Sequence, residues 1–494
     1  MRSEIKKMGT RVESESERIS AAVRSPSQRF RSNEGSDFIS SLPDAILHHI
    51  LSNIPTEHAI RTSVLSKRWK HVWRETPCLS FHCRTSDHPD SISKTLATFT
   101  APKITSFHAD VTFNNSSLTP SHVHSWIELA ASRNAEIMSI IIIIVSDDNV
   151  LPDFFFTNSS VKQLRLALGR RGNYNYCNVI PKCTVLWTSL RSLSLECCGL
   201  PDESLANILS GCPMLESLVL IFCQHIHHID LSKSMKLTRL EITGHYYGPA
   251  KIVAPHIRFL KLIGSLDPCV LVDVSSLTDA RFSLSYVRRT TTGEDDFHQD
   301  KLLKMLEQLQ HVENLTIGRI VLQALSVAEL RGLPFPQLQA KSLTVVMMVV
   351  RSFIPALARL LQNSPGLQKI TVTTVCYKGI HDQELDRHLR TQGLNPDRCW
   401  RLKYGDFPTT EQTYSSSSSG VVSKLAKSKD VVSFIKLVLQ NSKAVETMVL
   451  RLDGYLDATE YQKLLRMVPT FTRNKNVRTR GQAKRLLNVL KIIP

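Results

Sequence analysis

The stretch Asp202–Leu220, DESLANILSGCPMLESLVL, contains a helix signal followed by a strand signal. Asp202 can cap a helix, because a carboxylate accepts hydrogen bonds from the free N–H groups of a first helical turn. Gly211 and Pro213 are typical of a helix end. Three apolar residues at helical spacing lie between these signals: Leu205, Ile208 and Leu209. An L-x-x-L-x-L pattern then points its alternating leucines to one side of a short strand: Leu215, Leu218 and Leu220.

The strand pattern of this unit recurs along the chain. Nine copies begin at Val161, Leu190, Leu215, Leu237, Ile257, Leu277, Val312, Leu367 and Val445. Through the middle of the chain the copies start roughly 20–29 residues apart, which is the period of leucine-rich repeats. A further pair, Leu343 and Val345, is out of frame at Lys341. Since no single unit can bury its apolar face alone, the copies predict an α/β solenoid with a parallel sheet.

An apolar run, MSIIIIIV at Met138–Val145, precedes the first copy. β-branched residues favour strands, and an uninterrupted apolar run is typical of a strand that is buried on both faces. The run is far shorter than the roughly 20 residues of a membrane-spanning helix. We therefore predict a buried strand here and no association with a membrane.

The 11 cysteines include no C-x-x-C pair, which favours free thiols in a reducing compartment. Cys198 and Cys223 each lie three residues after the last strand leucine of a copy. A small polar group at that position of the repeat can bond the turning backbone, so both thiols are predicted to be structural. The cluster most similar to a metal site is Cys223, His225, His227, His228 and Asp230. We do not expect it to bind metal, because zinc sites usually need four ligands held by further hydrogen bonds.

A second apolar pattern lies N-terminal to the repeats, in LPDAILHHILSNIPTEHAIRTSVLSKRWKHVW at Leu42–Trp73. Pro43 suits a first helical turn, Pro55 ends that helix, and Thr56 can cap a second one. The first helix has five apolar residues at helical spacing: Ile46, Leu47, Ile50, Leu51 and Ile54. A third helix is predicted to carry one apolar side: Val64, Leu65, Trp69, Val72 and Trp73. Together these signals predict a compact three-helix unit.

This stretch resembles the F-box, the short helical module that docks a Skp-type adaptor in cullin-RING ubiquitin ligases. Its combination with leucine-rich repeats resembles the large plant F-box/LRR families. The resemblance implies adaptor contacts at Leu42, Pro43, Ile46, Leu47, Ile50, Leu51, Val64, Leu65 and Trp69. Trp69 either contacts the adaptor or packs in the core, and Trp73 is predicted to be a core residue. The surrounding lysines and arginines are then a solvated rim that keeps an apolar module soluble.

Composition and these patterns divide the chain into five parts. Residues 1–36 are polar and charged, and we predict that they are disordered. The F-box is predicted at 37–76 and the repeat solenoid at 77–400. A flexible Ser-rich linker is predicted at 401–430. The remaining residues, 431–494, combine a basic tail with the stretch FIKLVLQNSKAVETMVLRL, which resembles the second half of the FBD segment of many F-box/LRR proteins.

The sequence carries no pattern for catalysis or for cofactor binding: GxGxxG, GxxxxGK[ST], GxSxG and HExxH are all absent. We therefore expect no catalytic residue, no metal and no cofactor. The resemblance implies a substrate-recognition subunit of an SCF-type ubiquitin ligase. The F-box would dock the Skp-type adaptor, and through it a cullin, while the repeats hold a substrate protein. The lack of a signal-peptide core favours the nucleus or the cytoplasm.

Three alternatives stay open at this point. The segment from Val421 to Pro494 holds 15 Lys and Arg against five Asp and Glu, a charge that nucleic acid could recruit. We do not expect nucleic-acid binding, because the tail lacks closely interleaved aromatic residues. The repeats could instead form a scaffold that never recruits a ligase. A small molecule could also lie under the substrate, although no residue identifies one.

The strand residues between the buried leucines point to the exposed inner face of the predicted sheet. Substrate contacts are predicted at Arg165, Glu241, Lys261 and Arg281, in one stripe with Ser194, Val219 and Thr316. Reversing the charges of Glu241 and Lys261 is predicted to impair substrate capture and to leave adaptor binding intact. In the alternative, loops or the tail from Arg466 to Pro494 hold the substrate.

Overall fold

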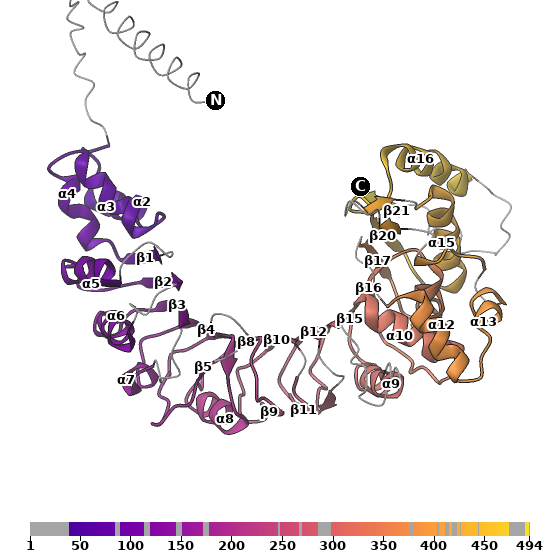
Figure 1. Ribbon diagram of the computed structural model, residues 1–494, viewed down its shortest axis with the longest axis horizontal. Coiled ribbons are helices and arrows are strands. Elements are labelled where there is room, and N and C mark those ends of the chain that lie inside the picture. The colour runs from indigo at the N-terminus through magenta and orange to yellow at the C-terminus, as the bar shows by residue number, and fades with distance from the viewer. Residues whose placement is uncertain are drawn as a thin grey trace, which may run out of the picture.

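The protein is an open arc of repeats with a helical unit at its N-terminal end (Figure 1). The computed structural model describes residues 39–83, 89–112, 119–144, 151–170, 177–245, 248–265, 269–284, 298–375, 380–402, 405–410, 414–416, 422–424, 426–442, 444–473 and 490–493. The disorder predicted for residues 1–36 concerns a segment outside these ranges.

In the described part of the chain, one parallel sheet of 14 strands lines the inner side of the arc (Figure 1). Its strands, in spatial order, are β1 (Cys78–Cys83), β2 (Ser106–Thr112), β3 (Ile137–Ile144), β4 (Gln163–Arg170), β6 (Ser192–Glu196), β8 (Ser217–Ile221), β10 (Arg239–His245), β12 (Phe259–Ser265), β14 (Asp279–Leu284), β15 (Asn314–Ile317), β16 (Ser342–Met347), β17 (Lys369–Thr374), β20 (Thr447–Arg451) and β21 (Leu490–Ile493). The spatial order follows the chain order, as expected when each repeat stacks on the preceding one.

Helices cover the outer side of this sheet towards both ends of the arc (Figure 1). They are α5 (Pro89–Ala97), α6 (Pro120–Ser132), α7 (Asp153–Phe156), α8 (Asp202–Ser210), α9 (Gln299–Gln308), α10 (Arg319–Leu330), the 3₁₀ turn η3 (Arg351–Phe353), α11 (Ile354–Gln362), α12 (Asp382–Thr391), α13 (Pro396–Leu402), α15 (Ser428–Asn441) and α16 (Ala458–Arg473).

The middle of the arc carries short strands in place of outer helices. The copies that begin at Leu237, Ile257 and Leu277 start only 20 residues apart, which leaves too little chain for a helix between strands. A second parallel sheet of three strands lies there instead: β9 (His228–Asp230), β11 (Lys251–Val253) and β13 (Val270–Val272). Two further strand pairs are small: β5 (Cys177–Asn178) with β7 (Cys198–Gly199), and β18 (Tyr414–Ser416) with β19 (Val422–Lys424).

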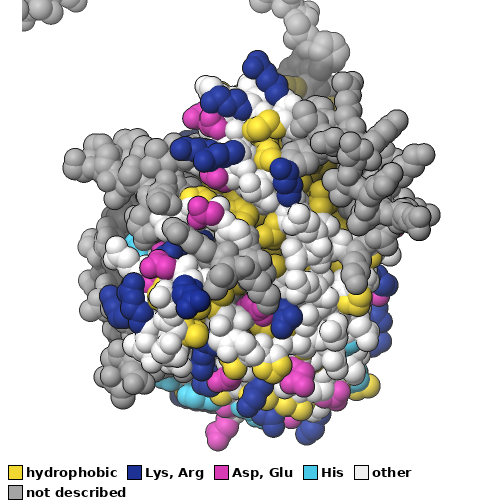
Figure 2. All heavy atoms as spheres, turned by 90° about the vertical axis from the view of Figure 1, so that its right-hand side faces the viewer, with side chains coloured by type: hydrophobic (Ala, Val, Ile, Leu, Met, Phe, Trp, Pro, Cys, Tyr) yellow, Lys and Arg dark blue, Asp and Glu magenta, His cyan; other side chains and the backbone are white. Residues whose placement is uncertain are grey.

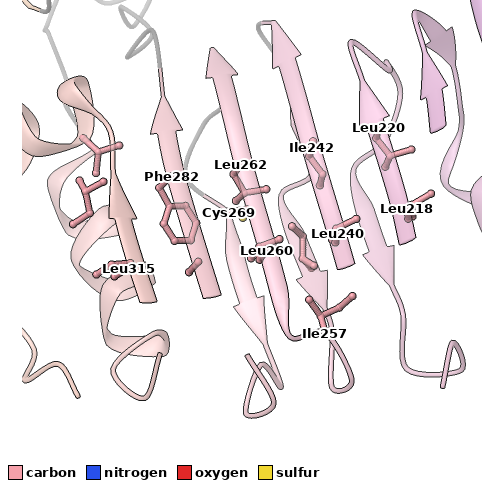
Figure 3. Close-up of a cluster of buried hydrophobic side chains, with 14 of the residues drawn as sticks. Leu218, Leu220, Leu240, Ile242, Ile257, Leu260, Leu262, Cys269, Phe282 and Leu315 are labelled. Carbon is pink, nitrogen blue, oxygen red and sulfur yellow. The ribbon is translucent and has the colours of Figure 1, made fainter. Parts of the chain in front are cut away.

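The repeating leucines form continuous buried rows along the arc, which confirms the repeat prediction. Leu218 is in register with Leu240, and Leu240 with Leu260, so that each rung stacks its leucine on the next (Figure 3). All three side chains are buried. Leu343 and Val345 also continue these rows, since β16 pairs in register with both neighbouring strands. The prediction that this rung is out of frame was therefore wrong.

Asp202 does not cap its own helix as predicted. It is the first residue of α8, and its carboxylate makes no capping hydrogen bond. Its two oxygens instead accept hydrogen bonds from the backbone N–H groups of His227 (2.7 Å) and His228 (3.1 Å) in the following repeat. This carboxylate thus ties one repeat to the next. Gly211 ends α8 as predicted.

The sheet begins earlier and ends later than the copies indicate. Strands β1, β2 and β3 precede the first copy, and β21 follows β20, the strand of the last copy. In β3 the side chains of Met138, Ile140 and Ile142 are buried, whereas Ile141 on the other face is half-buried. The prediction that this strand is buried on both faces was wrong, because its second face belongs to the open inner side of the arc.

Candidate interaction surfaces

The N-terminal unit contains five short helical segments. They are α2 (Asp44–Leu51), α3 (Thr56–Arg61), the 3₁₀ turn η1 (Thr62–Val64), α4 (Trp69–Val72) and the 3₁₀ turn η2 (Trp73–Glu75). The predicted third helix is therefore broken between Val64 and Trp69. The Ser66 hydroxyl accepts a hydrogen bond from the Trp69 N–H at 3.4 Å, so a new helical turn starts there. Leu65 and Trp69 consequently do not share one regular helix face.

Three of the predicted adaptor contacts lie in the core of this unit. Leu47 is 0%, Leu51 1% and Trp69 4% exposed, and all three pack with Val72 and Trp73. Leu42 is half-buried and packs against the same cluster. The core role predicted for Trp73 is confirmed, since this side chain is 6% exposed. Because the side chains of Leu47, Leu51 and Trp69 are buried, they can support a docking surface from beneath, but they do not form its exposed part.

The other predicted contacts are exposed on the same unit. The exposed fractions are 46% for Ile46, 42% for Ile50, 88% for Val64 and 64% for Leu65. Pro43 is exposed as well. Ile39 is a further large apolar residue at the surface (58%), which the sequence reasoning missed although it lies three residues before the Leu-Pro pair.

Polar contacts hold the segment before α2 in place. The Trp69 indole N–H donates to the Ser40 hydroxyl at 2.9 Å. The Arg68 guanidinium donates to the Ser40 carbonyl oxygen and to the Asp44 carboxylate. Through this hydrogen bond Arg68 holds the pKa of Asp44 below its usual range. Arg68 therefore positions the Leu42–Pro43 turn and is more than part of a solvated rim.

The helical unit also closes the first edge of the repeat sheet. The side chain of Thr56 is 4% exposed, and its hydroxyl accepts a hydrogen bond from the Ser80 N–H in β1 at 2.8 Å. The carbonyl oxygen of Arg74 accepts hydrogen bonds from the N–H groups of Thr100 (2.9 Å) and Ala101 (3.0 Å). These bonds attach the unit to the first two repeats.

The predicted substrate contacts lie on the inner face, and three of them are neighbours. Glu241 on β10 is in register with Lys261 on β12, which is in register with Arg281 on β14. Arg165 lies on β4, separated from β10 by β6 and β8, and it pairs with Glu196 at 2.9 Å. The stripe thus divides into a central group and a separate Arg165–Glu196 pair.

The central group contains contacts that the sequence did not predict. The Glu241 carboxylate accepts hydrogen bonds from Lys261 at 2.9 Å and from Arg239. Burial by itself would raise the pKa of Glu241, but hydrogen bonds from Lys261 and Arg239 outweigh it and hold that pKa below its usual range. The guanidinium carbons of Arg239 and Arg281 lie 4.0 and 5.1 Å from the ring centre of Phe259.

Cys198 and Cys223 have the structural role that was predicted. The Cys198 thiol donates to the Glu196 carbonyl oxygen at 3.2 Å, and the Cys223 thiol donates to the Leu195 carbonyl oxygen at 3.3 Å. The hydrogen bond with Cys223, together with burial, raises the pKa of Cys198 well above its usual range. Within the described ranges no group of three or more His, Cys, Asp or Glu side chains could hold a metal ion.

A buried ionic network anchors the C-terminal part of the arc. Arg351 contacts Asp382 (Nε to Oδ2, 3.1 Å) and Asp386 (Nη2 to Oδ2, 2.8 Å). Asp382 also accepts hydrogen bonds from the N–H and hydroxyl groups of Thr410, and Asp386 accepts one from the Trp400 indole. Residues 405–410, which we predicted as part of a flexible linker, are therefore packed against α12. A mixed-charge cavity of about 460 Å³ lies beside this network.

The C-terminal end of the arc mixes both signs of charge. Figure 2, which views this end of the molecule, shows Lys and Arg side chains interspersed with Asp and Glu side chains. On the coloured atoms of this face the positive charge is therefore not one uninterrupted patch.

Among the helices that the structure describes, none combines the length and the apolar composition that a membrane span requires.

Comparison with known proteins agrees with both parts of this architecture. Residues 39–80 match the F-box domain, and residues 123–324 match the LRR repeats of the FBD-associated F-box protein At5g56370. The chain is 48% identical to the F-box/LRR-repeat protein At5g02910 of Arabidopsis thaliana over 453 residues, which cover 90% of this chain and 94% of that protein. It is 43% identical to the F-box/LRR-repeat protein At3g03360 of the same plant, over 90% of each chain.

These matches extend over 90% of this chain, which includes most of the helical unit and the repeats. Nearly the whole length of each relative is covered, so the likeness is not confined to one shared module. The N-terminal helical unit is an F-box, the parallel sheet is a leucine-rich-repeat array, and the chain belongs to the F-box/LRR-repeat family.

Proposed function

We propose that this protein is the substrate-recognition subunit of an SCF-type ubiquitin ligase. The observation that carries this proposal is the uneven burial of apolar residues in the F-box. The unit closes Leu47, Leu51 and Trp69 into its own core and leaves other large apolar side chains exposed: Ile39, Ile46, Ile50, Val64 and Leu65. Such exposure is costly in water and is typical of a surface that a partner covers. A Skp-type adaptor is the partner that an F-box implies.

The chain itself would contribute binding and no chemistry. The adaptor connects the F-box to a cullin, and the repeats hold the substrate protein near the subunit that carries ubiquitin. Holding two reactants together raises their effective concentration, which accelerates transfer without a catalytic group in this chain. No cofactor is required for this role, and its place of action would be the nucleus or the cytoplasm.

Co-precipitation with a Skp-type adaptor tests the proposal. We expect Ile50→Glu and Leu65→Glu each to weaken adaptor binding by at least about 30-fold, because loss of a buried interface anchor typically costs about 2 kcal/mol or more. Met235→Glu is the matched control. Met235 is also a large exposed apolar residue (67%), but it lies in the turn before β10, far from the F-box.

Two outcomes would contradict the proposal. Adaptor binding that is equally strong in all three variants would show that the exposed F-box residues are not the docking surface. Absence of adaptor binding by the unmodified protein would favour a repeat scaffold that acts outside a ligase. Hydrogen exchange of the α2 amides in each variant controls for loss of folding.

A further inference from the structure

The inner face of the arc carries a central patch on strands β10, β12 and β14. We define this patch by Arg239, Glu241, Phe259, Lys261, Ile263 and Arg281. Register places these side chains on one face: Glu241, Lys261 and Arg281 lie opposite one another, and two residues earlier Arg239 and Phe259 lie opposite each other, with Asp279 next in that row. The leucines between them point to the core, so the patch is the surface of the sheet that faces the open side of the arc.

Charge in the central patch is only partly compensated. Glu241 is shared between Arg239 and Lys261, which leaves two cations around one carboxylate. Arg281 forms no ion pair among the residues that the structure describes, and Asp279 on the same strand and face instead accepts a hydrogen bond from the Thr278 hydroxyl at 3.0 Å. Its guanidinium lies 5.1 Å from the Phe259 ring centre, and the guanidinium of Arg239 lies 4.0 Å from the same ring. An aromatic ring attracts each cation, but the two like charges repel each other.

An apolar area adjoins these cations. Phe259 and Ile263 on β12 are half-buried, as are Val219 and Ile221 on β8. Their side chains lie on the inner face, because the residues that alternate with them, such as Leu220 and Leu262, are buried in the core. The stripe of inner-face residues predicted from the sequence includes only Val219 from this apolar area.

We propose that the central patch binds an extended protein segment in which carboxylate side chains alternate with apolar ones. A carboxylate would pair with the exposed edge of the Arg281 guanidinium and relieve its repulsion with Arg239, while an apolar neighbour covers Phe259. The Arg239 and Arg281 guanidiniums lie against one aromatic ring, while Arg239 and Lys261 already share the Glu241 carboxylate. A single carboxylate at Arg281 therefore fits the patch better than a dianionic phosphate, which the Glu241 carboxylate would repel.

This inference deepens the proposed function, because it names the chemistry of the substrate segment that the repeats would hold. It does not depend on adaptor binding, so the two can fail independently. It also changes the sequence-based expectation for Glu241 and Lys261. These residues pair with each other, so reversing both keeps the net charge of the patch, but it also removes the carboxylate beside Arg239 and changes two contacts at once. Arg281, which forms no ion pair in the described part of the chain, is the informative position.

Fluorescence anisotropy on the full chain co-purified with its adaptor, or on the full chain alone, tests the patch directly. The probe is a labelled peptide of repeated Asp-Leu-Glu-Phe. We expect Arg281→Ala to weaken its binding about tenfold, the effect of one lost charge-assisted hydrogen bond, and Arg281→Lys to weaken it less. Arg191→Ala is the matched control, because Arg191 pairs with Glu216 on the rim and is also exposed.

Three results would overturn the inference. One is that the peptide does not bind the unmodified chain. A second is equal binding of the neutral Asn-Leu-Gln-Phe counterpart, and a third is tighter binding of a phosphoserine counterpart that is also lost on Arg281→Ala. Binding of the acidic peptide to a chain that captures no adaptor would support the patch and contradict the proposed function. Adaptor capture without peptide binding would support the proposed function and contradict the inference about the patch.

Discussion

Ile46 and Leu47 are adjacent apolar residues of the F-box with opposite environments. Leu47 is 0% exposed and packs under Trp69 and Trp73, whereas Ile46 is 46% exposed. A helix turns by about 100° per residue, so the pairs Ile46–Leu47 and Ile50–Leu51 form an apolar stripe too wide for one small core. One half of that stripe closes the core, and the other half stays exposed at the surface.

Leu47→Ala should therefore destabilise the F-box by about 2–5 kcal/mol, because it opens a cavity in a core that cannot collapse around it. Ile46→Ala should change the stability by less than about 0.5 kcal/mol, as is usual for surface positions. Hydrogen exchange of the α2 amides in the full chain measures both effects. Equal protection in the two variants would contradict the division of roles between these neighbours.

At the scale of elements, ionic and polar bonds attach segments that have little apolar pattern of their own. The loop at 405–410 is held to α12 by Asp382, which is 1% exposed. Burial by itself would lower the pKa of Arg351, but the two nearby carboxylates outweigh burial and raise that pKa. The guanidinium therefore stays charged, and it needs both acids as partners in a site largely closed to water.

Asp382→Ala should release the loop at 405–410, because Arg351 and Thr410 each lose a buried partner. Breaking one side of a buried ion pair costs about 3–5 kcal/mol, and the lower end applies here because Asp386 remains. Hydrogen exchange of residues 405–410 should become much faster. Asp397→Ala is the control, since Asp397 lies nearby but is exposed. Unchanged exchange in the Asp382 variant would show that packing alone holds the loop.

At the scale of the whole molecule, the arc is one structure from the F-box to β21. Strand β20 pairs with β17 although about 70 residues separate them, and α15 and α16 follow the same outer layer (Figure 1). Buried residues of α15 and β20 extend the main core: Phe434, Ile435, Val438, Met448 and Leu450. The FBD-like segment is thus a continuation of the repeat array and not a separate unit behind a linker.

A chain that ends at residue 400 should aggregate, because it exposes the edge of β17 and the core face that α15 covers. A chain that ends at Arg473 loses β21 and exposes the edge of β20, but it keeps α15 over the core face and should stay monomeric. Size-exclusion chromatography with light scattering distinguishes the two. A monodisperse chain of residues 1–400 would show instead that the array is complete without its C-terminal segment.

Much of this fold was predictable from local periodicity. The x-L-x-L pattern predicts which side chains of a strand share a face. That prediction identified the buried rows from Leu164 to Leu450. The position of Cys198 and Cys223 after each strand likewise predicted their backbone bonds. Strand β1 was missed because Thr76 stands where a repeat copy has its leading leucine. Strands β2 and β21 were overlooked although both follow the pattern, with Ile104, Phe107 and Ala109 in one and Leu487, Leu490 and Ile492 in the other.

The tertiary structure decided which groups meet. Periodicity gives the direction of a side chain but not its neighbours on the next repeat, because those depend on the register of strands about 20 residues away in the chain. Only the register revealed that Glu241 and Lys261 form an ion pair. It also showed that Arg239 and Arg281 both lie against Phe259, and that Arg281 forms no ion pair in the described structure. In the F-box, likewise, the sequence determined which residues are apolar, while the packing of five short helical segments determined which of them remain at the surface.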